Sequence, residues 1–202
     1  MSAAIEARGG ALAAEELARA NLYGLVARLF YAPPDADLLA AIATAPELAA
    51  EDDRYGVAAA WRDLKAEAAR ADAEAVREEY DAIFIGTGKA EVTPYAGAHL
   101  MRHSADTPLV RLRNFLSESR LVRRESANEP EDHIAGLCEA MRHLILRGDA
   151  ERQERLFREF LYPGATRLCD AIDNCAFAVF YRAPARLLKN FLALEQNAFD
   201  MV

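Results

Sequence analysis

Regularly spaced helix breakers divide this chain into segments of helical length, and this feature constrains its fold most. Pro33 and Pro34 end a first segment, Gly148 and Asp149 separate two others, and Pro163 follows another. Within the segments, apolar residues recur every three or four positions, which gives a helix one apolar face. No stretch shows the alternation that is typical of a half-buried strand. The sequence therefore predicts an all-α fold, a single compact helical domain of about nine helices.

The length of the chain fits one domain. A protein of 202 residues buries about 70% of the surface that its unfolded chain exposes. No internal repeat, low-complexity segment or long linker divides the sequence. We expect residues 1–11 to form a disordered tail and residues 12–202 to form the domain. The polar loop 123–129 is the expected hinge, so both a monomer and a helix-exchanged dimer fit the pattern.

Charge and composition argue against several classes of protein. The net charge is −8, whereas nucleic-acid binding calls for a basic face, so no nucleic-acid partner is expected. No apolar run reaches the roughly 18 residues of a membrane span, and the first residues lack the apolar core of a signal peptide. We expect a cytoplasmic protein without stable membrane insertion. The three cysteines show no CxxC spacing, which argues against a zinc or redox motif.

The most informative segment is 128–141, which reads Asn-Glu-Pro-Glu-Asp-His-Ile-Ala-Gly-Leu-Cys-Glu-Ala-Met. Pro130 suits the first position of a helix, where its missing N–H would have no helical partner. Glu131 and Asp132 would then lie at the positive end of the helix dipole. We therefore predict a helix that begins at Pro130. Neither the position of Pro130 nor the helix dipole accounts for His133, and the residues alone favour a solvated or locally paired histidine.

Two further motifs accompany Glu129-Pro130-x-Asp132-His133. Residues 79–86 read Glu-Tyr-Asp-Ala-Ile-Phe-Ile-Gly and are followed by Val-Thr-Pro-Tyr-Ala-Gly at 92–97, and the helix predicted at 12–31 ends in aromatic residues before a proline. Together the motifs resemble the TorD/DmsD/NarJ family of redox-enzyme maturation chaperones, and within it the TorD/DmsD-like branch. The resemblance covers most of 12–194. Ala96-Gly97 departs from it, because relatives often carry a small acidic or hydroxyl pair there.

This resemblance implies a function and a site. Members of the family bind the twin-arginine leader of an exported molybdenum-containing oxidoreductase, hold it in the cytoplasm, assist cofactor insertion and proofread the enzyme before export. The expected partners are that leader and the mature part of the molybdoenzyme, with no catalytic residues, no metal and no resident cofactor. The expected leader-binding residues are Glu129, Pro130, Asp132, His133, Tyr80, Phe84, Gly86, Pro94 and Tyr95.

The chemistry of such a leader predicts how its site is arranged. Its apolar part fits a hydrophobic groove as a helix, and its arginines fit carboxylates that accept bidentate hydrogen bonds. We expect the loop after Phe84 and the helix from Pro130 to converge on one groove with an aromatic wall. Asp132 and His133 are expected at its polar rim.

Other readings of the sequence remain open. His99 and His103 stand four residues apart on a predicted helix, so a metal-dependent all-α enzyme is one alternative, although Leu100 replaces the glutamate of the zincin motif. A general helical scaffold is another. The arginine-rich stretch 102–124 is a candidate surface for an anionic cofactor or an acidic partner. The sequence does not name the molybdoenzyme that would be the client.

Overall fold

The computed structural model describes residues 13–48, 53–86, 89–100, 107–122 and 129–201. Within them the helical elements join into nine continuous segments, as predicted, and no named strand is present. The elements are α1 (Ala14–Tyr31), α2 (Ala36–Thr44), α3 (Val57–Arg70), α4 (Ala73–Tyr80) with the π-helical turn η1 (Asp81–Ile85), α5 (Ala96–Leu100), α6 (Pro108–Glu118), α7 (Ile134–Leu146), α8 (Ala150–Leu156) continuing through the π-helical turn η2 (Phe157–Leu161) into α9 (Tyr162–Asp173), and α10 (Arg182–Asp200).

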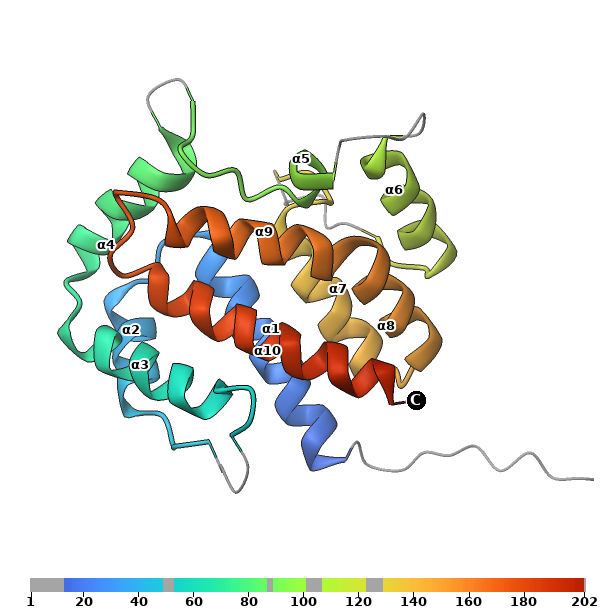
Figure 1. The fold of residues 1–202 in the computed structure, drawn as a ribbon, viewed down its shortest axis with the longest axis horizontal. Coiled ribbons are helices and arrows are strands. Elements are labelled where there is room, and N and C mark those ends of the chain that lie inside the picture. The colour runs from blue at the N-terminus through green and yellow to red at the C-terminus, as the bar shows by residue number, and fades with distance from the viewer. Residues whose placement is uncertain (1–12, 49–52, 87–88, 101–106, 123–128, 202) are drawn as a thin grey trace, which may run out of the picture.

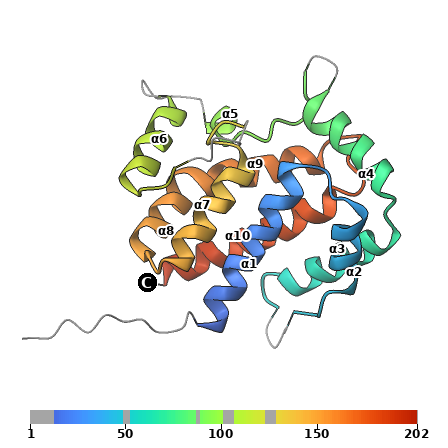
Figure 2. The ribbon, with the colours of Figure 1, turned by 180° about the vertical axis from the view of Figure 1, so that it is seen from behind.

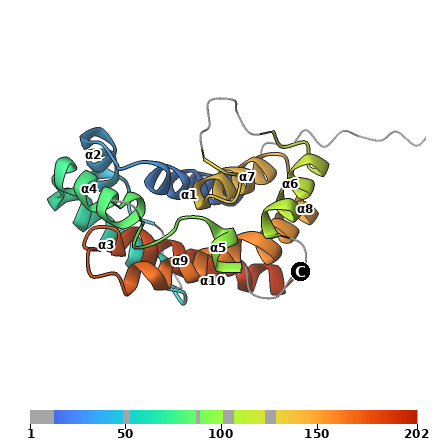
Figure 3. The same ribbon diagram turned by 90° about the horizontal axis from the view of Figure 1, so that it is seen from above.

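Four helices form the two central layers of the fold (Figure 1). Helices α1 and α7 pack side by side in one layer, which Figure 2 shows from its outer face. Helices α9 and α10 form the other layer, and the view from above separates the two (Figure 3). Helices α2, α3 and α4 lie at one end of this sandwich, and α6 and α8 lie at the other.

Aspartate caps set three of the helix starts. The carboxylates of Asp35, Asp72 and Asp149 accept hydrogen bonds from backbone N–H groups in the first turns of α2, α4 and α8. Each bond satisfies one of the donors that a helix start leaves without an intrahelical partner. Gly148 closes α7 with a φ of 67°, the left-handed conformation that glycine adopts without strain.

The predicted helix start at Pro130 is wrong by four residues. Helix α7 begins at Ile134, and His133 is its N-cap. Residues 130–133 form a turn instead, in which the N–H of His133 donates to the carbonyl of Pro130 at 3.1 Å. Glu131 and Asp132 therefore precede the helix and do not lie in its first turn.

The predicted break at Pro163 is also wrong. The backbone is helical from Ala150 to Asp173, and Pro163 lies at the start of α9, directly after the π-helical turn η2. A π-helical turn bonds residue i to i+5, so the hydrogen-bond register changes there. This change accommodates a residue without an N–H, and the chain continues as a helix.

One hydrophobic cluster runs through both central layers, from Ala20 to Leu192. Cys138 is fully buried in it and packs as a small core residue. A buried charge ties the layers together: Glu195 accepts bonds from Arg19 at 2.8 and 2.7 Å and from the Tyr23 hydroxyl at 3.0 Å. These contacts fix the start of α1 against the end of α10.

Several predictions fall outside the described residues. They include the expected N-terminal tail, all of the expected hinge except Glu129, and His103. The oligomeric state and the domain limits stay predictions. Among the described helices, none is long and apolar enough to cross a membrane.

Candidate functional site

A pair of short segments brings two of the predicted motifs together. The carbonyl of Pro94 accepts from the N–H of Ile134 at 2.9 Å, and the carbonyl of Asp132 accepts from the N–H of Ala96 at 2.8 Å. A third bond runs from the N–H of Gly97 to the Asp132 carboxylate at 3.1 Å. We call the segments 94–97 and 132–134 the clasp. The two motifs therefore lie together as expected, but no residue of 94–97 lines the groove described below.

Two glycines permit the clasp. A Cβ at Gly97 would lie 2.5 Å from the carboxylate oxygen of Asp132, and a Cβ at Gly164 would lie 2.5 Å from the Cβ of Ala96. The departure from the family pattern at Gly97 thus has a steric reason: the carboxylate occupies the space of the missing side chain. Helix α5 packs closely on α9 for the same kind of reason at Gly164.

His133 has a structural role that the sequence did not reveal. Its Nδ1 accepts the N–H of Ala135 at 3.1 Å and so caps α7. The ring is only 3% exposed and lies edge-on to the rings of Tyr31 and Tyr95. Burial lowers the pKa of His133 below its ordinary value of 6.5, while Glu129 opposes this shift. The imidazole is therefore neutral at pH 7, as its role as a hydrogen-bond acceptor requires.

Two carboxylates flank this capped helix start. Glu129 accepts a hydrogen bond from the hydroxyl of Tyr95, and Arg113 lies 3.1 Å from Glu131. Burial, together with the bond to Glu129, raises the pKa of Tyr95 to about 12, so the phenol stays a donor at neutral pH. The bond links the clasp to the carboxylate that stands directly before Pro130.

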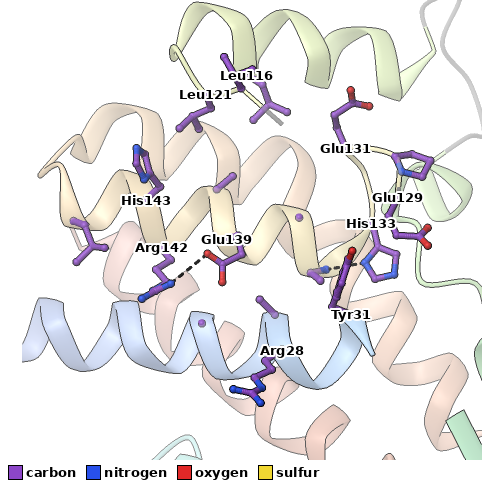
Figure 4. A pocket seen from close by; sticks show the side chains of 18 of the residues that line it. Arg28, Tyr31, Leu116, Leu121, Glu129, Glu131, His133, Glu139, Arg142 and His143 are labelled. Atoms are coloured by element: carbon purple, nitrogen blue, oxygen red, sulfur yellow. Dashed lines mark hydrogen bonds and ion pairs between the residues drawn. The ribbon is translucent and has the colours of Figure 1, made fainter. Parts of the chain in front are cut away.

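A groove with a volume of about 1000 Å³ runs along the outer face of α1 and α7 and is bordered by the end of α6 (Figure 4). This volume is at the upper end of ligand sites, so it suits several peptide side chains better than one small molecule. The groove is lined by Asn21, Gly24, Ala27, Arg28, Tyr31, Leu116, Arg120, Leu121, Val122, Glu129, Pro130, Glu131, His133, Ala135, Gly136, Glu139, Ala140, Arg142, His143 and Leu146.

The predicted site residues fall into three groups in the structure. Glu129, Pro130 and His133 line the groove. Pro94 and Asp132 hold the clasp behind it, and Tyr95 connects the two through Glu129. Asp132 is 9% exposed, and burial raises its pKa above the ordinary 3.8 against the opposing bond from Gly97. The structure thus places Asp132 beneath the site, whereas we expected it at the rim.

The remaining predicted residues do not line the groove. Tyr80 and Phe84 are 6% and 5% exposed, and their rings pack on each other and on Tyr181 in the core. The Tyr80 hydroxyl donates to the carbonyls of Phe30 and Tyr31 at the end of α1. Gly86 ends η1 with a φ of 65°. The aromatic wall expected from Tyr80 and Phe84 is therefore a buried support for the end of α1.

Sequence reasoning missed the residues that form most of the groove. Its floor consists of small residues on facing turns, Gly24 and Ala27 from α1 and Gly136 and Ala140 from α7. Their three- and four-residue spacing was visible in the sequence, but small residues at that spacing are equally typical of close helix packing. The apolar side wall consists of Leu116 in the last turn of α6 and Leu121 just after that helix.

The described residues do not assemble a metal site. No group of three or more potential ligands lies together in the described part of the chain, and His103 is outside it. The ring of His99 is bonded through Nε2 to the carbonyl of Thr93 at 3.1 Å. Of the arginine-rich stretch 102–124, the described part carries Arg111, which lies over the Phe160 ring, Arg113, which pairs with Glu131, and Arg120, which lines the groove.

Comparisons with known proteins agree with this fold and these motifs. The family model of the nitrate reductase delta subunit matches residues 50–171. The chaperone protein TorD of Photobacterium profundum is 27% identical over 133 residues, which are 58% of this chain and 60% of that protein. The chain thus spans less than two thirds of this curated relative. A solved structure of a protein assigned to redox enzyme maturation in Archaeoglobus fulgidus matches with a TM-score of 0.51 at 19% identity, covering 93% of this chain and 99% of that one, and it shows the same fold.

Fold, motifs and comparisons together define the class, an all-helical protein with the fold of a redox-enzyme maturation protein. The chain belongs to the nitrate reductase delta subunit family, to which the TorD chaperones are related. This finding confirms the family resemblance seen in the motifs. The family is one of chaperones and not of enzymes.

Proposed function

We propose that this protein is a cytoplasmic chaperone that binds the twin-arginine leader of a molybdenum-containing oxidoreductase in the groove between α1, α6 and α7. It holds the leader while the cofactor is inserted and releases the enzyme for export afterwards. The observation that carries the proposal is the position of the groove. It opens at the Glu129-Pro130-x-Asp132-His133 motif, and Glu129, Pro130 and His133 line it.

The lining of the groove supports a peptide with a basic and an apolar part. Leu116, Leu121 and Leu146 offer apolar surface, and the floor of small residues admits the close approach of a helix. Glu129 and Glu131 stand at the motif end, where each carboxylate can accept further hydrogen bonds besides the partners it already has. A leader with arginines next to an apolar segment matches both features.

Calorimetric titration with leader peptides of the molybdoenzymes from the same genome tests this proposal. We expect one leader to bind with a dissociation constant of about 1 µM or lower. The same peptide with glutamine in place of both arginines should bind at least about tenfold more weakly, because charge-assisted hydrogen bonds are lost. If no leader binds, the proposed activity is contradicted and a general helical scaffold becomes the better account.

A further inference from the structure

The two ends of the groove carry opposite charge. Helices α1 and α7 run antiparallel along it, since Gly24 lies beside Arg142 at one end and Tyr31 lies beside His133 at the other. At the His133 end stand the carboxylates Glu129 and Glu131 (Figure 4). At the opposite end the lining carries the cations Arg120 and Arg142, with His143 beside them.

The other charged groups in the lining do not cancel this polarity. Glu139 lies one turn before Arg142 on α7, and their ion pair at 3.4 Å reduces the charge at the cationic end, where Arg120 stands in addition to this pair. Arg28 points to the side of α1 away from α7 and lies 3.7 Å from Asp35 (Figure 4). Arg113 reduces the charge at the motif end through Glu131 but does not line the groove. Glu129 stands at that end in addition to this pair.

A helix bound in such a groove has a preferred direction. Its N-terminal end is positive and its C-terminal end is negative, because the peptide dipoles align along the axis. The carboxylates therefore favour the N-terminal end of the helix at the motif, and the cations favour its C-terminal end near Arg142. In a twin-arginine leader the arginines precede the apolar segment, so charge and dipole favour the same direction.

On the basis of the proposed function, we infer that the groove binds its leader in one direction, with the arginine pair at Glu129 and Glu131 and the C-terminal end of the apolar helix at Arg120, Arg142 and His143. The bound helix then runs parallel to α7 and antiparallel to α1. The cationic end of the groove thus contributes to specificity, because it favours leaders whose helix ends beside it.

Photo-crosslinking measures this direction. A synthetic leader peptide carries a benzophenone residue either just before the arginine pair or at the last position of the apolar segment, and mass spectrometry locates the crosslink. We expect the first probe to label the end at Tyr31 and Pro130, and the second to label the end at Leu121 and Leu146. The reverse pattern, or equal labelling of both ends by each probe, overturns the inferred direction and leaves leader binding intact.

A second measurement isolates the cationic end. Leader peptides that stop at the end of the apolar segment are titrated with a free C-terminal carboxylate and with a C-terminal amide. The free carboxylate should bind about two- to fivefold more tightly to the wild-type protein, and Arg142→Gln should reduce this difference, because Arg120 alone remains at that end. Arg186→Gln, on the exposed face of α10, is the matched control and should retain the full difference. An equal preference in wild type and Arg142→Gln overturns the inference, whereas absence of binding by any peptide contradicts the proposed function itself.

Discussion

The carboxylate of Asp132 accepts the backbone N–H of Gly97 at 3.1 Å and fills the space that a side chain at position 97 would need. Gly97 and Asp132, which are 35 residues apart in the sequence, thus complement each other: glycine leaves the space that the carboxylate fills, and its N–H donates the bond that the carboxylate accepts. The bond fixes the clasp that presents Tyr95 to Glu129 at the end of the groove. Asp132 is therefore a positioning residue, whereas Glu129, like Glu131, lines the groove where a ligand would bind.

The first prediction concerns this match. Gly97→Ala should destabilise the protein and weaken leader binding, because its Cβ would displace the Asp132 carboxylate. Asp132→Ala should cost about 1–3 kcal/mol by leaving the Gly97 N–H without its acceptor. Urea unfolding measures both effects.

Gly24→Ala is the matched control for Gly97→Ala. Its Cβ would meet the flexible side chain of Arg142, which can move aside. Alanine also favours the helix interior over glycine, so this variant should be at least as stable as the wild type. A Gly97→Ala protein with wild-type stability would contradict the steric role of the clasp.

The second prediction concerns the buried carboxylate of Glu195. Glu195→Ala should lower the free energy of unfolding by about 2–4 kcal/mol, because Arg19 and Tyr23 lose a partner that is 2% exposed. Glu159→Ala removes the exposed ion pair with Arg155 and should have little effect. Thermal unfolding compares the two variants. Equal losses would show that the contacts between α1 and α10 do not depend on this charge.

The third prediction is a pH dependence from His133. Its pKa is lowered in the folded state, so the unfolded chain binds more protons around pH 6. The contribution of His133 to stability is therefore present above its ordinary pKa of 6.5 and is lost as the pH falls below it. Asp132 acts in the opposite sense at lower pH, because its pKa is raised: its contribution is present at acidic pH and is lost as the pH rises through the folded value.

Unfolding free energies at about pH 7.5 and pH 5.5 measure this dependence. His133→Asn keeps a side chain that can cap α7, and it should lose less stability on acidification than the wild type. His143→Asn, at the exposed end of the same helix, should behave like the wild type. A His133→Asn protein with an unchanged pH dependence would contradict the assignment.

The fourth prediction separates Glu129 from Asp132 as ligand contacts. Glu129→Gln should weaken leader binding about tenfold or more without a comparable loss of stability, since a charge-assisted hydrogen bond is lost at an accessible site. Glu78→Gln, exposed on α4, is the control. Asp132→Asn can still accept from Gly97 and should bind the leader nearly as well as the wild type. A larger loss in Asp132→Asn than in Glu129→Gln would place the arginines at Asp132 instead.

The helix pattern was largely readable from the sequence because its signals are local. An aspartate before an apolar helical pattern indicates a cap: Asp72 and Asp149 are caps as this signal predicts, and of Asp35 and Asp37, which both fit it, Asp35 is the cap. The helix start at Pro130 was predicted wrongly because a proline before a helix fits either the first helical turn or a preceding turn. Which of the two forms depends on the hydrogen bonds of the clasp. The helix break at Pro163 was predicted wrongly because the π-helical turn that precedes this proline has no clear sequence signal.

The site was readable only in part because its geometry is tertiary. Motif residues such as Tyr80 and Phe84 serve the core, and a sequence motif does not distinguish residues that contact a ligand from those that support them. The floor at Gly24 and Gly136 becomes visible only once α1 and α7 lie side by side. The role of Gly97 likewise depends on a carboxylate that is distant in the sequence.

The most direct test of the groove as the leader site is to fill it with a larger side chain and titrate that variant with the leader peptide. Ala140→Leu places a larger side chain in the groove, and Ala18→Leu makes the same change on the exposed part of α1, outside the lining. We predict that Ala140→Leu weakens leader binding at least about tenfold while Ala18→Leu binds like the wild type. Wild-type affinity in a folded Ala140→Leu protein would contradict the groove as the leader site.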